Sequence, residues 1–397
     1  MKKQAAVFGV VAFLMSNSIF AGNALLDSLV EKNILTGAEA ADISSQMPSP
    51  LVWTGDVRMR FQSEKLDGKS DSRDRTRFRL RLGTKAKIND KITAGFGISS
   101  GESPDARSNN QSFGSGGNAF EFYTLSVNHA YIQYAYDTDT TVILGKMNKP
   151  FWVVSDMLWD QDINPDGVAV QWKANAPFTE YFVNAGYFVM NEMKSDTGFG
   201  GASLMMIQPG VAYTFDKNTE GKIALSIYKT NNVMGVDATK LANGKDNEKT
   251  LASNTLSGEK LVYEYNPVIL TGELKLKEFT GLPYASLFGE YVNNPGANSG
   301  QQAALIGVKF GNEKVKKEGE WQGQLTYRYL QADAWLDIFP DSDYYSGNTG
   351  VQGVRAQLQY AVANNTVLSG SYYRFEKLTV GDIKKSDLFQ LDLQVSF

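Results

Sequence analysis

Arginines recur at every second position in two stretches of the sequence, and this spacing decides what chemistry they could perform. Apolar residues such as Phe78 and Leu80 stand between them, so a strand would place all the arginines on one face. A guanidinium stays charged and binds oxyanions through paired hydrogen bonds, so such a face would attract anions. The alternative is a solvated charged face without selectivity. The set is Arg58, Arg60, Arg75, Arg77, Arg79 and Arg81, and we expect Arg374 to share its orientation.

Acidic residues gather in a single stretch that also contains Phe151, Trp152 and Trp159. Aromatic side chains in that number indicate a segment that packs against other parts of the protein, although a surface loop is the alternative. The alternating acids resemble a calcium-binding loop, but Pro165 stands where that loop requires Gly, and Gln171 stands where it requires Glu. We therefore expect no metal site here. The acids are Asp156, Asp160, Asp162 and Asp166.

Few other residues could support catalysis or ligand chemistry. The chain has no Cys and one His, His129, which excludes thiolate catalysis and a centre built from several Cys or His ligands. A lipase-type site would need a serine within reach of His129, and no Ser lies two residues away on its face of a strand. We expect no enzymatic activity and no cofactor. The sequence pI of about 5.4 and the net charge of −4 indicate no nucleic-acid partner.

From Leu51 onward, apolar and polar residues tend to alternate, which predicts that β-strands carry these side chains. No apolar run after residue 24 is long enough for a transmembrane helix, yet aromatic residues make up 12% of the chain. This combination predicts an all-β fold, a transmembrane antiparallel β-barrel of about sixteen strands, because only every second residue has to face lipid. The predicted strands are 52–63, 74–87, 92–100, 122–136, 141–147, 168–173, 181–190, 205–215, 222–230, 260–277, 284–292, 303–311, 320–333, 351–361, 367–377 and 387–397.

The connections between the predicted strands alternate between short turns and longer polar segments. Turns such as 89–90 and 363–366 alternate with loops such as 148–167 and 334–350, which is typical of a barrel with short periplasmic turns and long external loops. The prediction of one strand over 260–277 is the weakest, because Asn266-Pro267 could interrupt it. In the last strand, apolar residues alternate with polar ones up to Phe397, which we expect to act as the assembly signal.

Residues 1–50 differ from the rest of the chain. Lys2 and Lys3, an apolar stretch and small residues up to Ala21 or Ala24 predict a secretory signal peptide over 1–24. Residues 25–50 predict a short helical periplasmic segment, with a capping box from Thr36 to Glu39. A segment that enters the barrel or aids oligomer contacts is the alternative. The barrel domain is then 51–397.

Three stretches resemble the putative-porin family of bacterial outer-membrane proteins. They are LLDSLVEKNILTGAEAADI after the signal, the hairpin TGDVRMRFQ with RDRTRFRLRLG, and the block ILGKMNKPFW with LWDQDINPDGVAVQW. The resemblance implies passive diffusion of small solutes and, by analogy with general porins, a homotrimer whose third loop folds into the lumen. The acids 156–166 would then face the arginines across the pore.

The sequence therefore predicts an outer-membrane porin, a water-filled channel for small hydrophilic solutes and ions. Selectivity in such a channel depends on pore width and on lining charges, and the arginines favour anions. The alternatives are a channel that prefers small anions or carboxylates and, with much less support, a barrel enzyme. The expected partners are the lipid bilayer with its lipopolysaccharide and the outer-membrane assembly machinery.

Overall fold

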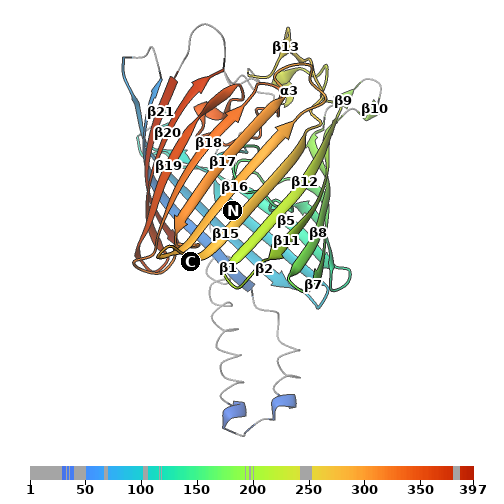
Figure 1. Ribbon diagram of the computed structural model, residues 1–397, viewed down its shortest axis with the longest axis vertical. Helices are drawn as coiled ribbons and strands as arrows, with labels where there is room; N and C mark the ends of the chain where they lie inside the picture. Colours follow the sequence, from blue (N-terminus) through green and yellow to red (C-terminus); the bar gives the residue numbers. More distant parts are fainter. Residues whose placement is uncertain are drawn as a thin grey trace.

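The computed structural model shows a barrel of tilted antiparallel strands (Figure 1). The strands run from one rim to the other, and the long loops gather at the upper rim in this view. The structure describes residues 29–32, 34, 36–39, 51–66, 70–101, 106–115, 117, 119–192, 194–195, 198–199, 201–241, 253–378 and 385–397.

The wall of the barrel closes without a free edge. The sheet contains seventeen strands, of which β4 (Gln111–Ser112) pairs with β2 beside the wall, and the other sixteen form the closed ring. The predicted strand number and fold class are confirmed. The wall strands are β1 (Leu51–Leu66), β2 (Arg73–Lys87), β3 (Ile92–Ser100), β5 (Leu125–Ala135), β6 (Thr140–Lys146), β7 (Asp166–Ala176), β8 (Thr179–Asn191), β11 (Ala202–Thr214), β12 (Thr219–Asn231), β15 (Val268–Phe279), β16 (Leu282–Asn293), β17 (Gln302–Gly311), β18 (Trp321–Leu330), β19 (Val351–Ala363), β20 (Thr366–Lys377) and β21 (Lys385–Ser396).

The ring closes where β1 pairs antiparallel with β21. Phe397 and Gly55 exchange two backbone hydrogen bonds of 2.9 and 3.0 Å at the end of this pair. The Phe397 ring lies over Gly55, where a Cβ atom would approach the ring to 2.7 Å. A glycine at this position therefore lets the last aromatic ring cover the closing seam.

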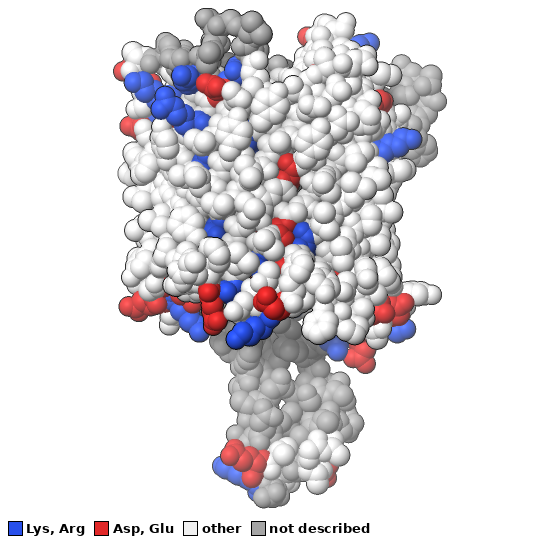
Figure 2. All heavy atoms as spheres, viewed as in Figure 1, with Lys and Arg blue, Asp and Glu red and all other residues white. Residues whose placement is uncertain are grey.

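Side chains on the strands alternate between the two faces of the wall. On β1, Met59 and Phe61 are 48% and 44% exposed on the outer face, whereas Arg60 and Gln62 are buried on the inner face. On the face of the barrel that Figure 2 shows, most of the surface between the rims carries no charged residue, and charged side chains are frequent at both rims. An apolar outer band with polar residues inside is what a bilayer requires of a barrel.

The connections at the two rims differ in length and content. Two-residue turns such as 364–365 join strands at one rim, whereas the opposite rim carries loops with short elements of their own. These elements are β9 (Lys194–Ser195), β10 (Gly198–Phe199), α3 (Ala238–Leu241), β13 (Leu256–Ser257), β14 (Lys260–Leu261) and η1 (Tyr345–Gly347).

The strand predicted over 260–277 is wrong, because it divides into β14 and β15. β15 begins at Val268, directly after Pro267, which has no backbone N–H for the ladder. The Asn266 side chain accepts a hydrogen bond of 3.0 Å from the backbone N–H of Thr230, and the carbonyl of Pro267 accepts one from Tyr228. Local bonds thus replace the regular ladder at this break.

Two loops fold back into the barrel and build a hydrophobic core there, which we call the lumen core. Loop 147–165 follows β6, and loop 331–350 follows β18. Trp159 of the first loop lies 4.7 Å from Phe339 and 6.0 Å from Trp335 of the second, measured between ring centroids. Trp335 is fully buried, and its indole N–H donates to the carbonyl of Leu158 at 2.8 Å. The two loops therefore form one packed unit.

The predicted signal peptide and most of residues 25–50 lie outside the described residues. The predicted capping box is confirmed: the backbone N–H of Thr36 donates to the Glu39 carboxylate at 2.8 Å, and the backbone N–H of Glu39 donates to Oγ1 of Thr36 at 3.2 Å. No helix within the described ranges has the length and apolar character needed to cross a membrane.

Candidate functional site

Six of the predicted arginines lie on the inner face of the β1–β2 pair, and we call this set the arginine wall. Arg58 is the cross-strand partner of Arg79, and Arg60 is the partner of Arg77. Because alternation puts apolar residues outside, the guanidiniums must point inward; an Arg facing lipid at mid-depth would cost about 2–4 kcal/mol. The members are Arg58, Arg60, Arg75, Arg77, Arg79 and Arg81.

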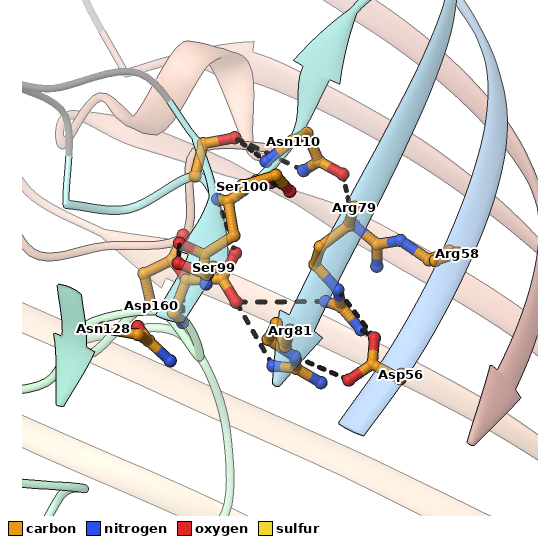
Figure 3. A network of polar contacts seen from close by, with 12 residues as sticks. Asp56, Arg58, Arg79, Arg81, Ser99, Ser100, Asn110, Asn128 and Asp160 are labelled. Atoms are coloured by element: carbon orange, nitrogen blue, oxygen red, sulfur yellow. Dashed lines mark hydrogen bonds and ion pairs between the residues drawn. The ribbon is translucent and has the colours of Figure 1, made fainter. Parts of the chain in front are cut away.

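Carboxylates from two sources meet the lower part of the arginine wall (Figure 3). Asp56, on β1 itself, accepts hydrogen bonds from Arg79 at 2.8 Å and from Arg81 at 2.7 Å. Asp162, from loop 147–165, lies 3.9 Å from Arg79 and 3.5 Å from Arg81. The loop thus brings one predicted acid into direct contact with the predicted arginines.

The middle of the arginine wall is held by carboxylates that the sequence prediction did not include. Arg60 donates two hydrogen bonds to Asp392 of β21, at 2.7 and 2.9 Å, and a third to Asp343 of loop 331–350 at 2.8 Å. Arg58 lies 3.8 Å from Asp392 and donates to the amide oxygen of Asn110 at 2.6 Å. Asp392 could have been recognised, because it lies on the polar face of the last predicted strand.

The upper part of the arginine wall makes looser contacts. Arg75 lies 3.6 Å from Glu64. Arg77 donates to Gln62 and to Ser108, both at 3.3 Å, and has no carboxylate within 4.0 Å among the residues that the structure describes. The density of ion pairs therefore falls toward the rim that carries the long loops.

Asp156 contacts arginines that the sequence prediction missed. Its carboxylate lies 3.4 Å from Arg328 of β18 and 3.0 Å from Arg355 of β19. The Arg328 guanidinium also stacks 3.5 Å from the centroid of the Tyr344 ring. Both arginines stand on the polar face of predicted strands, so alternation alone could have identified them as facing inward.

Loop 331–350 is the larger omission from the sequence prediction. Its carbonyl at Phe339 accepts a hydrogen bond of 2.7 Å from the backbone N–H of Asp160, and the N–H of Asp341 donates to the carbonyl of Asp156 at 3.2 Å. These bonds place Asp341 and Asp343 beside the acids of loop 147–165. Aromatic residues of this loop, such as Trp335 and Phe339, carry the same indication of packing as those of loop 147–165, but they do not show that the packing is inside the barrel.

Neither Asp160 nor Asp166 forms an ion pair with the arginine wall in the described part of the chain, although Asp160 lines the same cavity as that wall. The Asp160 carboxylate accepts hydrogen bonds from the backbone N–H groups of Asp162 and Ser342, at 2.8 and 3.1 Å. Burial, with Asp341 and Asp162 nearby, raises the pKa of Asp160 well above its usual range. Asp166 is the exposed first residue of β7 and pairs with Lys146 at 3.1 Å.

The predicted inward orientation of Arg374 is wrong, because this residue lies on the outer face of β20. Its side chain is 55% exposed and lies 3.9 Å from Asp387 on the neighbouring strand. Tyr373 and Phe375 occupy the inner face instead, where they pack against Tyr344 at 5.0 and 4.8 Å between ring centroids. Apolar residues face inward here because loop 331–350 covers them.

His129 lies on the inner face of β5, and a cross-strand glycine, Gly97, makes room for its ring. Asn128, the residue before His129, lies at a register shift and accepts a hydrogen bond of 2.9 Å from Asn164. It therefore helps to hold loop 147–165. Among the described residues, no group of three or more acidic, His or Cys side chains is arranged to hold a metal ion.

A cavity of about 250 Å³ lies between the arginine wall, the two inward loops and strands β19–β21. Six arginines and six aspartates contribute to its lining, together with amide and hydroxyl groups. The charged set is Arg58, Arg60, Arg79, Arg81, Arg107, Arg355, Asp156, Asp160, Asp162, Asp341, Asp343 and Asp392. This arrangement can hold water and small polar solutes beside fixed charges of both signs.

Comparison with known proteins agrees with this architecture. A family model described as putative porin matches residues 56–262 and 238–397. The solved structure of OprB from Pseudomonas putida at high pH aligns with a TM-score of 0.59 and 12% identity, over 91% of this chain and 96% of that chain.

Two further solved structures align less closely. A triple mutant of the Rhodopseudomonas blastica porin has a TM-score of 0.46 and 10% identity, over 87% of this chain and 100% of that one. A loop-L8 deletion mutant of OmpT, an outer membrane protein of Vibrio cholerae, has a TM-score of 0.48 and 10% identity, over 88% and 100%. No curated protein matches the sequence.

Proposed function

This chain belongs to the putative porin family, and from that premise we propose that it forms a water-filled channel for passive diffusion of small hydrophilic solutes and ions across the outer membrane. The observation that carries the proposal is the polar cavity beside the arginine wall, inside a closed barrel whose outer face is apolar. Charged and amide groups that line a lumen hydrate permeating solutes and set their electrostatic barrier.

Reconstitution in planar lipid bilayers tests the channel. We expect stepwise increases of conductance in potassium chloride and a shift in gel mobility on heating, since folded barrels resist SDS at room temperature. The matched control is the same protein after heat denaturation, which should insert no steps. Well-folded protein that gives no conductance would contradict the proposal.

A preference for anions is the second part of the proposal. The cavity has equal numbers of arginine and aspartate side chains in its lining. Burial raises the pKa of both Asp160 and Asp341 well above the usual range, so positive charge exceeds negative charge when these two are protonated. The preference is weak because ion pairs neutralise most of the arginine wall. The reversal potential in a potassium chloride gradient measures it, and a cation-selective channel would refute it.

The remaining proposals concern assembly and location. The chain resides in the outer membrane as a homotrimer, in contact with lipopolysaccharide, after insertion by the assembly machinery that recognises Phe397. The closing seam supports the last point, since Phe397 and Gly55 exchange backbone bonds there. Chemical cross-linking of the folded protein in detergent should give a trimeric band. The variant F397A should lower the amount that reaches the outer membrane.

A further inference from the structure

Arg58 differs from the other cavity-lining arginines of β1 and β2. The carboxylate nearest to it belongs to Asp392, at 3.8 Å, and that carboxylate already accepts two hydrogen bonds from Arg60. The one short contact of Arg58 is the neutral amide oxygen of Asn110 at 2.6 Å, and its Nε has no hydrogen-bond partner. Arg58 therefore lines the cavity as a cation without a carboxylate of its own.

Neutral polar groups on β19, β20 and β21 line the cavity together with Arg58. Gln394 is the cross-strand partner of Arg58, Ser369 is the partner of Asp392 on the next strand pair, and Gln359 is the partner of Ser369. Ser369 and Gln359 therefore continue the register row of Arg60 and Asp392, two residues along β21 from the row of Arg58 and Gln394. Adjacent strands lie about 4.8 Å apart, so a solute of sugar size can span the two rows. Within the described residues, the side chains of Gln359 and Ser369 make no hydrogen bond to the protein, and both line the cavity. They are free to bind a solute.

We infer that Arg58 and these two neutral groups of the neighbouring register row form a binding site for small hydroxylated monocarboxylates, whose carboxylate pairs with Arg58 and whose hydroxyl groups bond to Ser369 and Gln359. The inference rests on the proposed function, because the solute must reach the lumen. Arginine matches a carboxylate with two parallel donors. A doubly charged anion is disfavoured, because Asp392 and Asp162 also border the cavity and repel added negative charge.

The size of the cavity suits such a solute. Its volume of about 250 Å³ holds roughly eight water molecules at about 30 Å³ each. A hydroxy acid of single-sugar size would displace most of this water while it keeps bonds to the amide and hydroxyl groups of the wall. A carboxylate without hydroxyl groups would gain only the Arg58 contact and should bind more weakly.

Block of chloride current in planar bilayers tests the site in the full-length protein, with gluconate as the probe. We expect gluconate to reduce the current in a saturable manner, and R58Q to raise the half-blocking concentration by about tenfold or more. R58K, which keeps the charge but not the paired geometry, should restore part of the block. R374Q is the matched control, because Arg374 lies on the outer face, and its half-blocking concentration should equal that of the wild type.

The hydroxyl contacts are tested by comparing probes. In the wild type, acetate should block less than gluconate, and uncharged glucose should not block. The double variant Q359A/S369A should reduce gluconate block to the level of acetate and leave acetate block unchanged. Equal block by gluconate and acetate in the wild type, or unchanged gluconate block in a folded R58Q channel, would overturn the site. Absence of chloride current from folded wild-type protein would instead refute the proposed function.

Discussion

The two sides of the barrel interior contrast in chemistry. On the side of β1, β2 and β19–β21, the inner face carries guanidiniums, carboxylates and amides around a cavity. On the side of β8, β11, β12 and β15–β17, the inner face carries buried apolar residues such as Phe188, Ile269 and Phe288. Those residues belong to the same buried cluster as Trp159 and Trp335 of the inward loops. One half of the interior thus resembles the core of a soluble protein, and the other half resembles a polar surface.

The apolar side of the interior explains the orientation of the two inward loops. Burial of large apolar side chains contributes about 1.5–3 kcal/mol each, so the lumen core fixes the two loops firmly against one half of the wall. Their acidic residues then project toward the opposite half, where Asp162 reaches Arg79 and Asp343 reaches Arg60. The apolar half positions the groups that set the charge of the polar half.

Removal of the central tryptophan should break this arrangement most severely. Trp335 is fully buried and bonded to Leu158, so we expect W335A to lower the free energy of unfolding by about 3–5 kcal/mol. Released loops should also raise single-channel conductance and its noise. Urea unfolding and bilayer recording measure the two effects. W53A is the matched control, because Trp53 is 38% exposed on the outer face, and it should leave conductance unchanged.

Loss of a carboxylate that joins the two sides should have the next largest effect. Asp156 is buried between Arg328 and Arg355, so D156N leaves two guanidiniums without their nearest carboxylate. We expect a stability loss of about 3 kcal/mol and a reversal potential shifted toward anions. D156N with R355Q should recover part of both. A variant as stable as the wild type with unchanged selectivity would show that Asp156 is not the link.

The ionisation of the buried acids Asp160 and Asp341 should make the ion selectivity of the channel depend on pH. Asp160 and Asp341 have pKa values raised above the usual range, chiefly by burial, so each stays neutral to higher pH than an exposed aspartate. As the pH rises above the range in which exposed aspartates ionise, they lose protons and selectivity should move toward cations. Their stability contribution is present at low pH and is lost as pH rises through the folded pKa. D341N should flatten the pH profile of the reversal potential; a profile identical to that of the wild type would exclude Asp341.

The smallest expected effect is a difference between substitutions of Asp162 and Asp166 in their influence on the reversal potential. Asp162 contacts Arg79 and Arg81, whereas Asp166 is exposed and pairs with Lys146. D162N should shift the reversal potential toward anions, and D166N should change it by less than the scatter between recordings. Equal shifts in both variants would mean that the contacts of Asp162 do not set the field.

The sequence alone determined the barrel and the direction of most side chains. Alternation of polar and apolar residues placed Arg58 to Arg81 inside, because a bilayer tolerates few charges on the outer face. It also predicted the strand number and a last strand that ends at Phe397. The prediction was wrong at Arg374, where the rule itself changes: Tyr373 and Phe375 point inward because a loop covers them. Alternation of polar and apolar residues shows which side chains share a face of a strand. It shows that the polar face points inward only where the lumen beside that strand is polar.

The pairing of arginines with carboxylates in the candidate site depends on tertiary contacts. Asp343 and Asp392 are distant in sequence from Arg60, yet both lie within 2.8 Å of it. The aromatic residues of loop 331–350 indicate that the loop packs, but nothing local in the sequence shows that it folds into the barrel. Its direction is set by the packing of Trp335 and Phe339 against Trp159, a contact between residues far apart along the chain. Strand parity is a local property that a sequence records, whereas the fold of a loop into a lumen depends on surfaces that exist only after the barrel has closed.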